Sequence, residues 1–429
     1  MRPAYLQKYI IIVCSILLLS LFYIFSPSYH VLKANLFDQP LYFVPSSPTT
    51  FTKPTYQTFN TFTIAGTHPG STPPISFQET GQKQVILLTS YRSGSTFVGE
   101  IFNRHPDIFY HFEPLVAFDE SDNKGENAIY IDPEHRHQYV CQNPVEKVDH
   151  INRLFACKVP KWGWRSPDTV LKTRFDGQVQ KLTPMTTKGS CAGFGYCFRY
   201  KTKKLCNPPF CDTGATTEKE CSKTCPWVKN DMAVETCEKS KAVVLKIIRF
   251  CDGNLLLPLF ELYDNLAVIV QVRDPRGTFL SRVARNPRHP PEEFLLSVKT
   301  TCESAVLNHH AYRSKPDKFK IIRYEDVAYD PQTWARRIHE FAGIEFNQEV
   351  DDWIEENTNI QGLNPYGSTR NSSKTAENWR NLVNDKFLKM IFTVEEYCGG
   401  MMEIYGYRKI ESRKMLTDFD ISFVLDVEF

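Results

Sequence analysis

Five consecutive residues have the types that bind a phosphate or sulfate group: Arg92, Ser93, Gly94, Ser95 and Thr96. They lie between an apolar run and a stretch with helical periodicity. Free backbone N–H groups and the helix dipole at such a junction both favour an anion. The nucleoside-triphosphate signature G-x-x-x-x-G-K-[ST] is absent, which argues against an ATPase or a kinase. Taken alone, an ordinary strand-to-helix turn with a Ser/Thr cap explains the segment equally well.

A second segment has the same design. The apolar run 267–272 leads into Arg273, Asp274 and Pro275. Asp274 can cap a helix and Pro275 suits its first position, which places Ser281 about two turns into that helix. Arg273 and Ser281 could then reach one phosphate. A capped helix with surface arginines is the alternative, but two such loops in one sheet predict a ligand with two separated anionic groups.

A carboxylate follows another expected strand. Residues 108–112 (IFYHF) have strand character, and Glu113 stands at their carboxyl end, where open α/β sheets bind ligands. We predict that Glu113 is a general base; a structural carboxylate held by Arg92 or by backbone amides is the alternative. His105 and His111 are the next candidates, although a structural role fits each of them better. No cluster of His, Asp and Glu suggests a metal.

Four apolar runs predict the elements that position these residues. The runs 85–88, 242–248, 267–272 and 319–324 resemble strands buried on both faces, as in parallel sheets. They alternate with stretches that could be helical. This order predicts an α/β fold in which helices flank a parallel sheet.

The N-terminal part has a different character. The chain has 429 residues and a net charge of +2, so overall charge does not predict an anionic partner. Residues 9–25 carry no charge and follow Arg2 and Lys8, which predicts a short transmembrane signal anchor with a cytosolic N-terminus. A cleaved signal peptide is the alternative, but no small-x-small cleavage site follows. The expected parts are a cytosolic tail (1–8), the anchor (9–25), a Pro/Ser/Thr-rich lumenal stem (26–82), a catalytic domain (83–412) with a Cys-rich insertion (120–240), and a C-terminal tail (413–429).

Cysteine usage agrees with a lumenal domain. Of thirteen cysteines, Cys14 lies in the expected anchor, and the twelve that remain are an even number. This predicts disulfide bonds of unknown connectivity. No Cys-x-x-Cys pair occurs, which argues against a zinc site.

Four motifs in order carry a family resemblance. They are Thr89-Ser-Tyr-Arg-Ser-Gly-Ser-Thr-Phe97, Phe112-Glu-Pro114, Arg273-Asp-Pro-Arg-Gly277 with Ser281, and Tyr366-Gly-Ser-Thr-Arg-Asn-Ser-Ser with Thr-Ala-Glu-Asn-Trp-Arg380. Across about residues 83 to 412, this pattern resembles the carbohydrate 6-O-sulfotransferases of galactose, N-acetylglucosamine and N-acetylgalactosamine. It is most similar to the keratan sulfate galactose branch. The region between Ser281 and Cys302 is short for that family, which leaves the acceptor sugar open.

The resemblance implies a fold, a donor, an acceptor and a location. The fold is a P-loop-like parallel sheet flanked by helices and related to that of nucleotide kinases. The donor is 3′-phosphoadenosine 5′-phosphosulfate (PAPS), and the acceptor is a glycan or proteoglycan at the Golgi membrane, with no metal and no nucleic acid. The 5′-phosphosulfate site comprises Tyr91, Arg92, Ser93, Gly94, Ser95, Thr96 and Phe97, and Arg92 also acts in catalysis. The 3′-phosphate site comprises Arg273, Asp274, Pro275, Arg276, Gly277, Thr278, Phe279, Leu280 and Ser281, chiefly its first and last members. Whether the chain forms a homo-oligomer is open.

Two other classes of protein share parts of this pattern. A type II lumenal glycosyltransferase would have the same anchor, but the Asp-x-Asp match at Asp418 and Asp420 lies near the C-terminus, away from any expected strand. A non-catalytic glycan-binding protein would explain the anchor and the cysteines but not two anion loops. The sequon at Asn371 lies inside a family-like motif, so we expect low glycan occupancy. Trp379 and Arg380 either close over adenine, or Trp379 is a core residue and Arg380 is a surface residue.

Overall fold

The computed structural model describes residues 81–115, 128–131, 138–141, 144–158, 171–173, 179–181, 202–212, 214, 220–221, 224–225, 230–358 and 372–429. The chain divides into two compact units, Met1–His68 and Pro69–Phe429, and every described residue belongs to the second. The expected anchor and nearly all of the expected stem lie outside the described residues, as does Asn371. Among the helices that are described, none is long and apolar enough to cross a bilayer.

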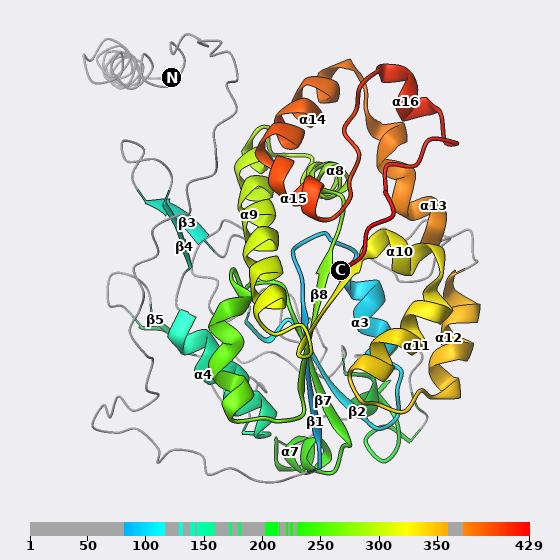
Figure 1. Ribbon diagram of the computed structural model, residues 1–429. Helices are drawn as coiled ribbons and strands as arrows, with labels where there is room; N and C mark the ends of the chain where they lie inside the picture. Colours follow the sequence, from blue (N-terminus) through cyan, green and yellow to red (C-terminus); the bar gives the residue numbers. More distant parts are fainter. Residues whose placement is uncertain are drawn as a thin grey trace, which may run out of the picture. The chain divides into compact units, whose positions relative to one another are not determined.

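The described part of the chain is built on a parallel five-stranded sheet with the order β2-β7-β1-β8-β9 (Figure 1). The strands are β1 (Lys83–Leu88), β2 (Ile108–Phe112), β7 (Ala242–Ile247), β8 (Leu266–Val272) and β9 (Phe319–Arg323). The four apolar runs therefore form strands, as predicted, and the α/β class is confirmed. Two short hairpins lie in the expected insertion: β3 (Ala128–Ile131) with β4 (Gln138–Cys141), and β5 (Leu171–Thr173) with β6 (Val179–Lys181).

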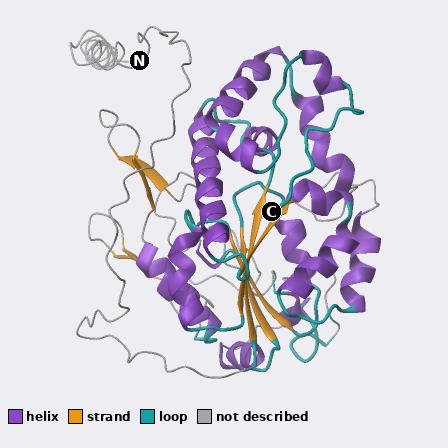
Figure 2. Ribbon diagram, in the orientation of Figure 1, coloured by secondary structure: helices purple, strands orange, loops and turns teal. Residues whose placement is uncertain are grey.

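Helices cover both faces of the sheet, which explains why its strands are continuously apolar (Figure 2). Alternate residues of β1 enter two separate hydrophobic clusters: Ile86 and Leu88 join one, and Val85 and Leu87 join the other. The first cluster contains residues of α4 (Pro144–Phe155), η3 (Gly253–Glu261), α8 (Pro275–Arg285), α9 (Glu293–Ser314), α14 (Asp385–Tyr397), α15 (Gly399–Ile404) and α16 (Arg413–Thr417). The second contains residues of α3 (Ser95–Asn103), α10 (Tyr324–Tyr329), α11 (Pro331–Phe341), α12 (Gln348–Thr358) and α13 (Ser372–Glu377). The first cluster also contains residues of η2 (Lys203–Cys206), α7 (Asn230–Glu238) and η4 (Asn378–Leu382).

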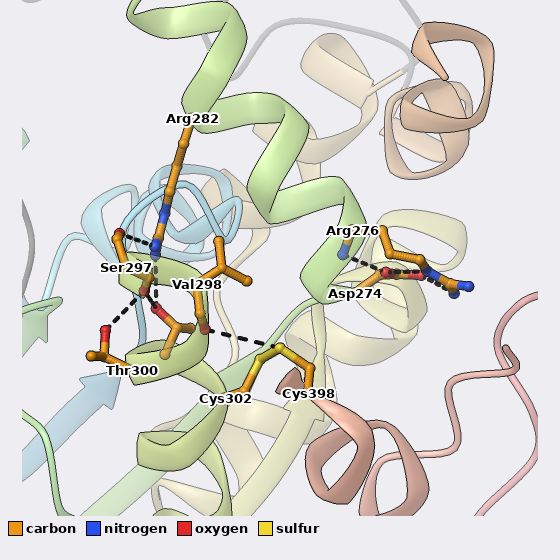
Figure 3. The surroundings of a disulfide bond; sticks show 9 residues. Asp274, Arg276, Arg282, Ser297, Val298, Thr300, Cys302 and Cys398 are labelled. Carbon is orange, nitrogen blue, oxygen red and sulfur yellow. Dashed lines mark hydrogen bonds and ion pairs between the residues drawn. A yellow bond between two sulfur atoms is a disulfide. The ribbon is translucent and has the colours of Figure 1, made fainter. Parts of the chain in front are cut away.

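Disulfide bonds join distant segments, as the cysteine count predicted. Within the described ranges the pairs are Cys141–Cys251, Cys157–Cys237, Cys206–Cys221, Cys211–Cys225 and Cys302–Cys398. The last pair links α9 to the junction of α14 and α15 (Figure 3). Cys14, Cys191 and Cys197 lie outside the described residues.

The last residues of the chain pack on the domain, although the sequence suggested a separate tail from residue 413. Phe423 is buried, and Tyr407 and Val424 form an antiparallel bridge. The Leu425 carbonyl accepts a hydrogen bond from Arg323 at the end of β9 (2.6 Å). The compact domain therefore extends into this segment, because its apolar residues complete the core.

Candidate functional site

A cleft of about 660 Å³ opens at the carboxyl ends of the central strands. It contains the ends of β2, β7 and β8 and the loop after β1, where open parallel sheets bind ligands. Its lining residues are Tyr91, Arg92, Gly94, Ser95, Thr96, Phe112, Glu113, Lys246, Ile248, Arg273, Gly277, Leu280, Ser281, Ala284, Arg285, Pro287, Thr375, Asn378, Trp379 and Leu382. Both predicted anion loops and the predicted base therefore face one cavity.

Two residues of the first loop have a left-handed backbone conformation. Gly94 is the residue before α3 and has φ 83°, and a Cβ there would lie 2.3 Å from the ring of Tyr324. Arg92 also has a left-handed backbone (φ 66°), which is uncommon for a residue with a side chain. The amides of Ser95 and Thr96 begin the helix, where N–H groups have no partner within the helix.

Two members of the predicted 5′ site do not line the cleft. Ser93 is fully buried, and its hydroxyl donates to the Ser90 carbonyl (2.8 Å) and lies 2.6 Å from the Thr89 hydroxyl. Phe97 belongs to the hydrophobic core and packs near Trp353. Both residues support the loop and do not reach its ligand-facing side.

The second loop meets the first directly. The Arg92 Nε donates to the Ser281 hydroxyl (3.0 Å), and Arg273 Nη1 donates to the Arg92 carbonyl (3.1 Å). The Arg273 guanidinium lies 4.8 Å from the centre of the Tyr324 ring, and its Nε is buried without a hydrogen-bond partner. An unpartnered charged donor beside a cleft is suited to an anionic ligand.

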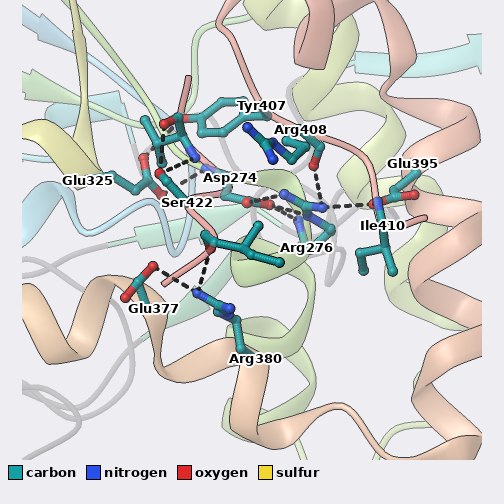
Figure 4. A network of polar contacts seen from close by, with 12 residues as sticks. Asp274, Arg276, Glu325, Glu377, Arg380, Glu395, Tyr407, Arg408, Ile410 and Ser422 are labelled. Atoms are coloured by element: carbon teal, nitrogen blue, oxygen red, sulfur yellow. Dashed lines mark hydrogen bonds and ion pairs between the residues drawn. The ribbon is translucent and has the colours of Figure 1, made fainter. Parts of the chain in front are cut away.

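Arg276 corrects the expectation that every residue from 273 to 281 contacts the ligand. Its guanidinium is fully buried and pairs with Asp274 (2.6 Å) and Glu395 (2.8 Å) (Figure 4). Asp274 caps α8 through the Arg276 amide. Pro275, Thr278 and Phe279 are likewise buried and absent from the cleft lining, which leaves Arg273, Gly277, Leu280 and Ser281 on it.

A buried acid holds the second loop from behind. Glu325 Oε1 accepts the Asp274 amide (3.0 Å), and Oε2 accepts the Tyr407 hydroxyl (2.9 Å) (Figure 4). Burial and the neighbouring Asp274 carboxylate raise the pKa of Glu325 to about 7. The C-terminal segment is therefore connected to the loop that presents Arg273.

Glu113 lies in the cleft between two cations. Lys246 Nζ donates to its Oε1 (2.7 Å) and Arg249 Nη1 to its Oε2 (3.2 Å). Burial acts to raise the pKa of this carboxyl, but Lys246 and Arg249 outweigh burial and hold the pKa below its usual value of 4.5. Glu113 is therefore ionised at neutral pH, as a proton acceptor must be. It is also the only carboxylate among the described residues that line the cleft.

The two histidine candidates are not in the cleft. His105 is buried, and its Nε2 lies 2.8 Å from the Glu345 carbonyl. His111 is buried on β2, where burial lowers its pKa to about 3. Neither residue can reach a ligand at the strand ends.

The C-terminal motif forms one wall of the cleft. Thr375, Asn378, Trp379 and Leu382 line it, whereas Arg380 is buried and donates to main-chain carbonyls of the C-terminal segment. Trp379 is both a core residue and part of the lining, because its ring packs against Phe423 and also borders Gly277. The motif residues 366–371 lie outside the described residues.

Besides Arg249 and Arg285, the sequence analysis missed Lys246 as a candidate site residue. It is almost fully buried on β7, directly beside Phe112 of β2, and it lines the cleft. The signal was present, since a lysine interrupts the apolar run AVVLKII. A buried lysine needs a charged partner. Here the partner is Glu113, which directly follows β2 and lines the cleft.

The charge of the lining is strongly positive. Arg92, Lys246, Arg273 and Arg285 face one carboxylate, Glu113, among the described lining residues. No three described His, Cys, Asp or Glu side chains are grouped as metal ligands. Asp418 and Asp420 are not part of the lining. Such a cleft can hold a ligand with several negative charges and place a carboxylate beside it.

Comparison with known proteins gives consistent matches. The model of the sulfotransferase domain matches residues 82–398. Carbohydrate sulfotransferase 1 of Danio rerio is 27% identical over 389 residues, which are 83% of this chain and 85% of that protein. Carbohydrate sulfotransferase 3 of Homo sapiens is 29% identical over 376 residues, with 80% and 70% covered. Carbohydrate sulfotransferase 6 of Homo sapiens is 28% identical over 388 residues, with 83% and 88% covered. The predicted similarity to carbohydrate sulfotransferases is confirmed.

Proposed function

Because this chain belongs to the sulfotransferase domain family, we propose that it transfers a sulfuryl group from PAPS to a hydroxyl group of a glycan. The contact between Arg92 and Ser281 is the observation that carries the proposal. It brings two anion loops into one cleft, as a donor with phosphate groups at both its 3′ and 5′ positions requires. The names of the similar proteins support a carbohydrate acceptor.

Different lining residues would hold different parts of the donor. Arg92 and the amides that begin α3 would hold the 5′-phosphosulfate, and Arg273 with Ser281 would hold the 3′-phosphate. Trp379 and Leu382 offer apolar surface for the nucleoside. Positioning and charge stabilisation supply most of the catalysis in transfers of this kind.

The transfer itself needs a proton acceptor and a stabilised leaving group. The acceptor oxygen bonds to sulfur while the bond from sulfur to the bridging phosphate oxygen breaks, and its electron pair stays on the phosphate. Arg92 would stabilise the charge that develops there. Glu113 would take the hydroxyl proton, with Lys246 and Arg249 fixing its orientation. A carboxylate of low pKa is sufficient if the transition state is loose, because the hydroxyl then loses its proton late.

The finer assignment follows from the motifs and the similar proteins. We propose the 6-hydroxyl of galactose or of an N-acetylhexosamine as the acceptor position, in a glycan such as keratan sulfate. We also propose that residues 9–25 anchor the protein in the Golgi membrane with the catalytic domain in the lumen. The disulfide bonds support an oxidising compartment.

The test is sulfate transfer from labelled PAPS by the full chain, with chelator present. Desulfated keratan, desulfated chondroitin and N-acetyllactosamine serve as acceptors, and the position of the new sulfate identifies the hydroxyl. Arg92→Ala should abolish transfer, whereas Arg336→Ala, at an exposed site on α11, should retain it. Normal transfer by Arg92→Ala, or metal-dependent transfer from a sugar nucleotide instead, would contradict the proposal.

A further inference from the structure

Three consecutive carbonyl groups of the first loop are tied to one neighbouring segment. Each accepts a hydrogen bond from a side chain that lies on β8, directly after β8, or on α8. The bonds run from Arg282 Nη2 to the Tyr91 oxygen (3.0 Å), from Arg273 Nη1 to the Arg92 oxygen (3.1 Å) and from Gln271 Nε2 to the Ser93 oxygen (2.9 Å). We call Gln271, Arg273 and Arg282 the carbonyl clamp.

Two members of the carbonyl clamp are separate from the cleft. Gln271 and Arg282 are almost fully buried and are absent from the lining. Arg282 also donates to the hydroxyl of Ser297 on α9 (Figure 3). A further hydrogen bond runs from Arg282 to the hydroxyl of Thr301 on the same helix, so Arg282 joins the loop to a long helix of the core. These two residues therefore act on the loop and not on a ligand.

The carbonyl clamp fixes the directions of the N–H groups of Arg92, Ser93 and Gly94, the three residues before α3. A trans peptide is planar, and its carbonyl and the next residue's N–H point in opposite directions. Holding three successive carbonyls therefore sets three peptide planes. It also maintains the left-handed backbone of Arg92, a conformation that persists only where the surroundings determine it.

We propose that Gln271 and Arg282 are positioning residues for the sulfuryl end of the donor. Through the carbonyl clamp they hold the first loop in the shape that receives a 5′-phosphate or 5′-phosphosulfate. The second loop does not depend on them in this way, since Asp274 is held by Arg276 and Glu325. This inference rests on the proposed function, because it assumes that the first loop binds the 5′ end.

Two nucleotides can be used to test the two loops of the cleft separately. Adenosine 3′,5′-bisphosphate would contact both loops, whereas adenosine 3′-monophosphate would contact only the second. The measured quantity is the ratio of their dissociation constants, obtained by calorimetry on the full chain. Arg282→Lys keeps the charge but loses the planar fork, and it should reduce the preference for the bisphosphate by at least about tenfold. Gln271→Met removes one donor and should reduce it by about two- to tenfold.

Arg380→Lys is the matched control. Arg380 is equally buried and also donates to main-chain carbonyls, but those belong to Met415, Leu416, Asp418 and Ile421. A change there can weaken both nucleotides together, and it should leave their ratio as in the wild type. A purely structural role for Gln271 and Arg282 would give the same pattern as this control.

The outcomes distinguish failure of the positioning role from failure of the proposed function. If the wild type prefers the bisphosphate and folded Gln271→Met and Arg282→Lys both keep that preference, the positioning role is refuted and the proposed function stands. If the wild type shows no preference for the bisphosphate, the donor assignment of the first loop fails, and the positioning role fails with it. Gln271→Met keeps the test decisive even if Arg282→Lys does not fold, because it changes only one hydrogen bond.

Discussion

Replacing Gly94 with alanine should damage both the stability of the domain and donor binding. The new Cβ would lie 2.3, 2.4 and 2.9 Å from three ring atoms of Tyr324, including the atom that joins the ring to its side chain. Tyr324 is almost fully buried, so its ring cannot swing into solvent. The clash must therefore be relieved by moving the loop, or by moving the ring that packs against Arg273.

The size of the effect follows from two terms. The left-handed backbone of Gly94 (φ 83°) costs an L-residue about 1–2 kcal/mol, and forcing an extra methyl group into a packed site costs about 1–3 kcal/mol. Gly94→Ala should therefore lower the free energy of unfolding by about 2–5 kcal/mol, a large part of the roughly 5–15 kcal/mol typical of a domain. Urea denaturation with the disulfides intact measures this difference.

Gly400→Ala is the matched control for this experiment. Gly400 lies in α15, and a Cβ there would meet nothing nearer than Val306 at 3.9 Å. Alanine is the better helix former, so this variant should be neutral or stabilised by up to about 1 kcal/mol. If Gly94→Ala unfolds at the same urea concentration as the wild type and binds adenosine 3′,5′-bisphosphate normally, the close packing of the loop against Tyr324 is contradicted.

Three further substitutions test separate parts of the site. Glu113→Gln should lower kcat by about 10²–10⁴-fold while the KM for PAPS changes little, and an unchanged kcat in steady-state assays would remove Glu113 as the base. Arg273→Ala should weaken adenosine 3′,5′-bisphosphate much more than 5′-AMP, and equal binding of the two nucleotides by the wild type would argue against a 3′-phosphate site. Glu325 has a pKa raised to about 7, so the native state binds its proton more tightly than the unfolded chain does. Stability should therefore fall by about 3 kcal/mol as the pH rises from 4.5 to 7, and Glu325→Gln should flatten that slope in urea titrations; a slope unchanged in the variant would assign it to other groups.

Most of the predictions that agree with the structure were based on short stretches of sequence. The apolar runs and the turn residues after them depend on neighbours within a few positions, so the strands and both loops could be recognised from the sequence. Glu113 could be placed for the same reason, because it directly follows a strand. That both loops line one cleft could only be inferred from the sequence. The contact of Arg92 with Ser281 was not predicted, since it joins residues on different strand-to-helix units.

The roles of the arginines in α8 and just before it show where a linear pattern was insufficient. Arg273 lines the cleft, but Arg276 and Arg282 are buried on other sides of the helix. The helical period of 3.6 places Gly277, Ser281 and Ala284 on one face, which is the face that lines the cleft. The sequence analysis assigned the whole segment to the 3′-phosphate site, and applying the period to it would have separated the cleft-lining residues from buried residues such as Arg276.

Support for the second loop comes from residues that are distant in sequence. Tyr407 donates to Glu325, which accepts the amide of Asp274, while Glu395 pairs with Arg276. None of these pairs has a sequence signature, because each partner is an ordinary polar residue until the fold brings them together. Buried polar groups must still be paired, so each one predicts that a partner exists without naming it. The predicted anion loops could be recognised from the sequence because their residues are consecutive, whereas the residues that hold the loops in shape depend on the whole fold.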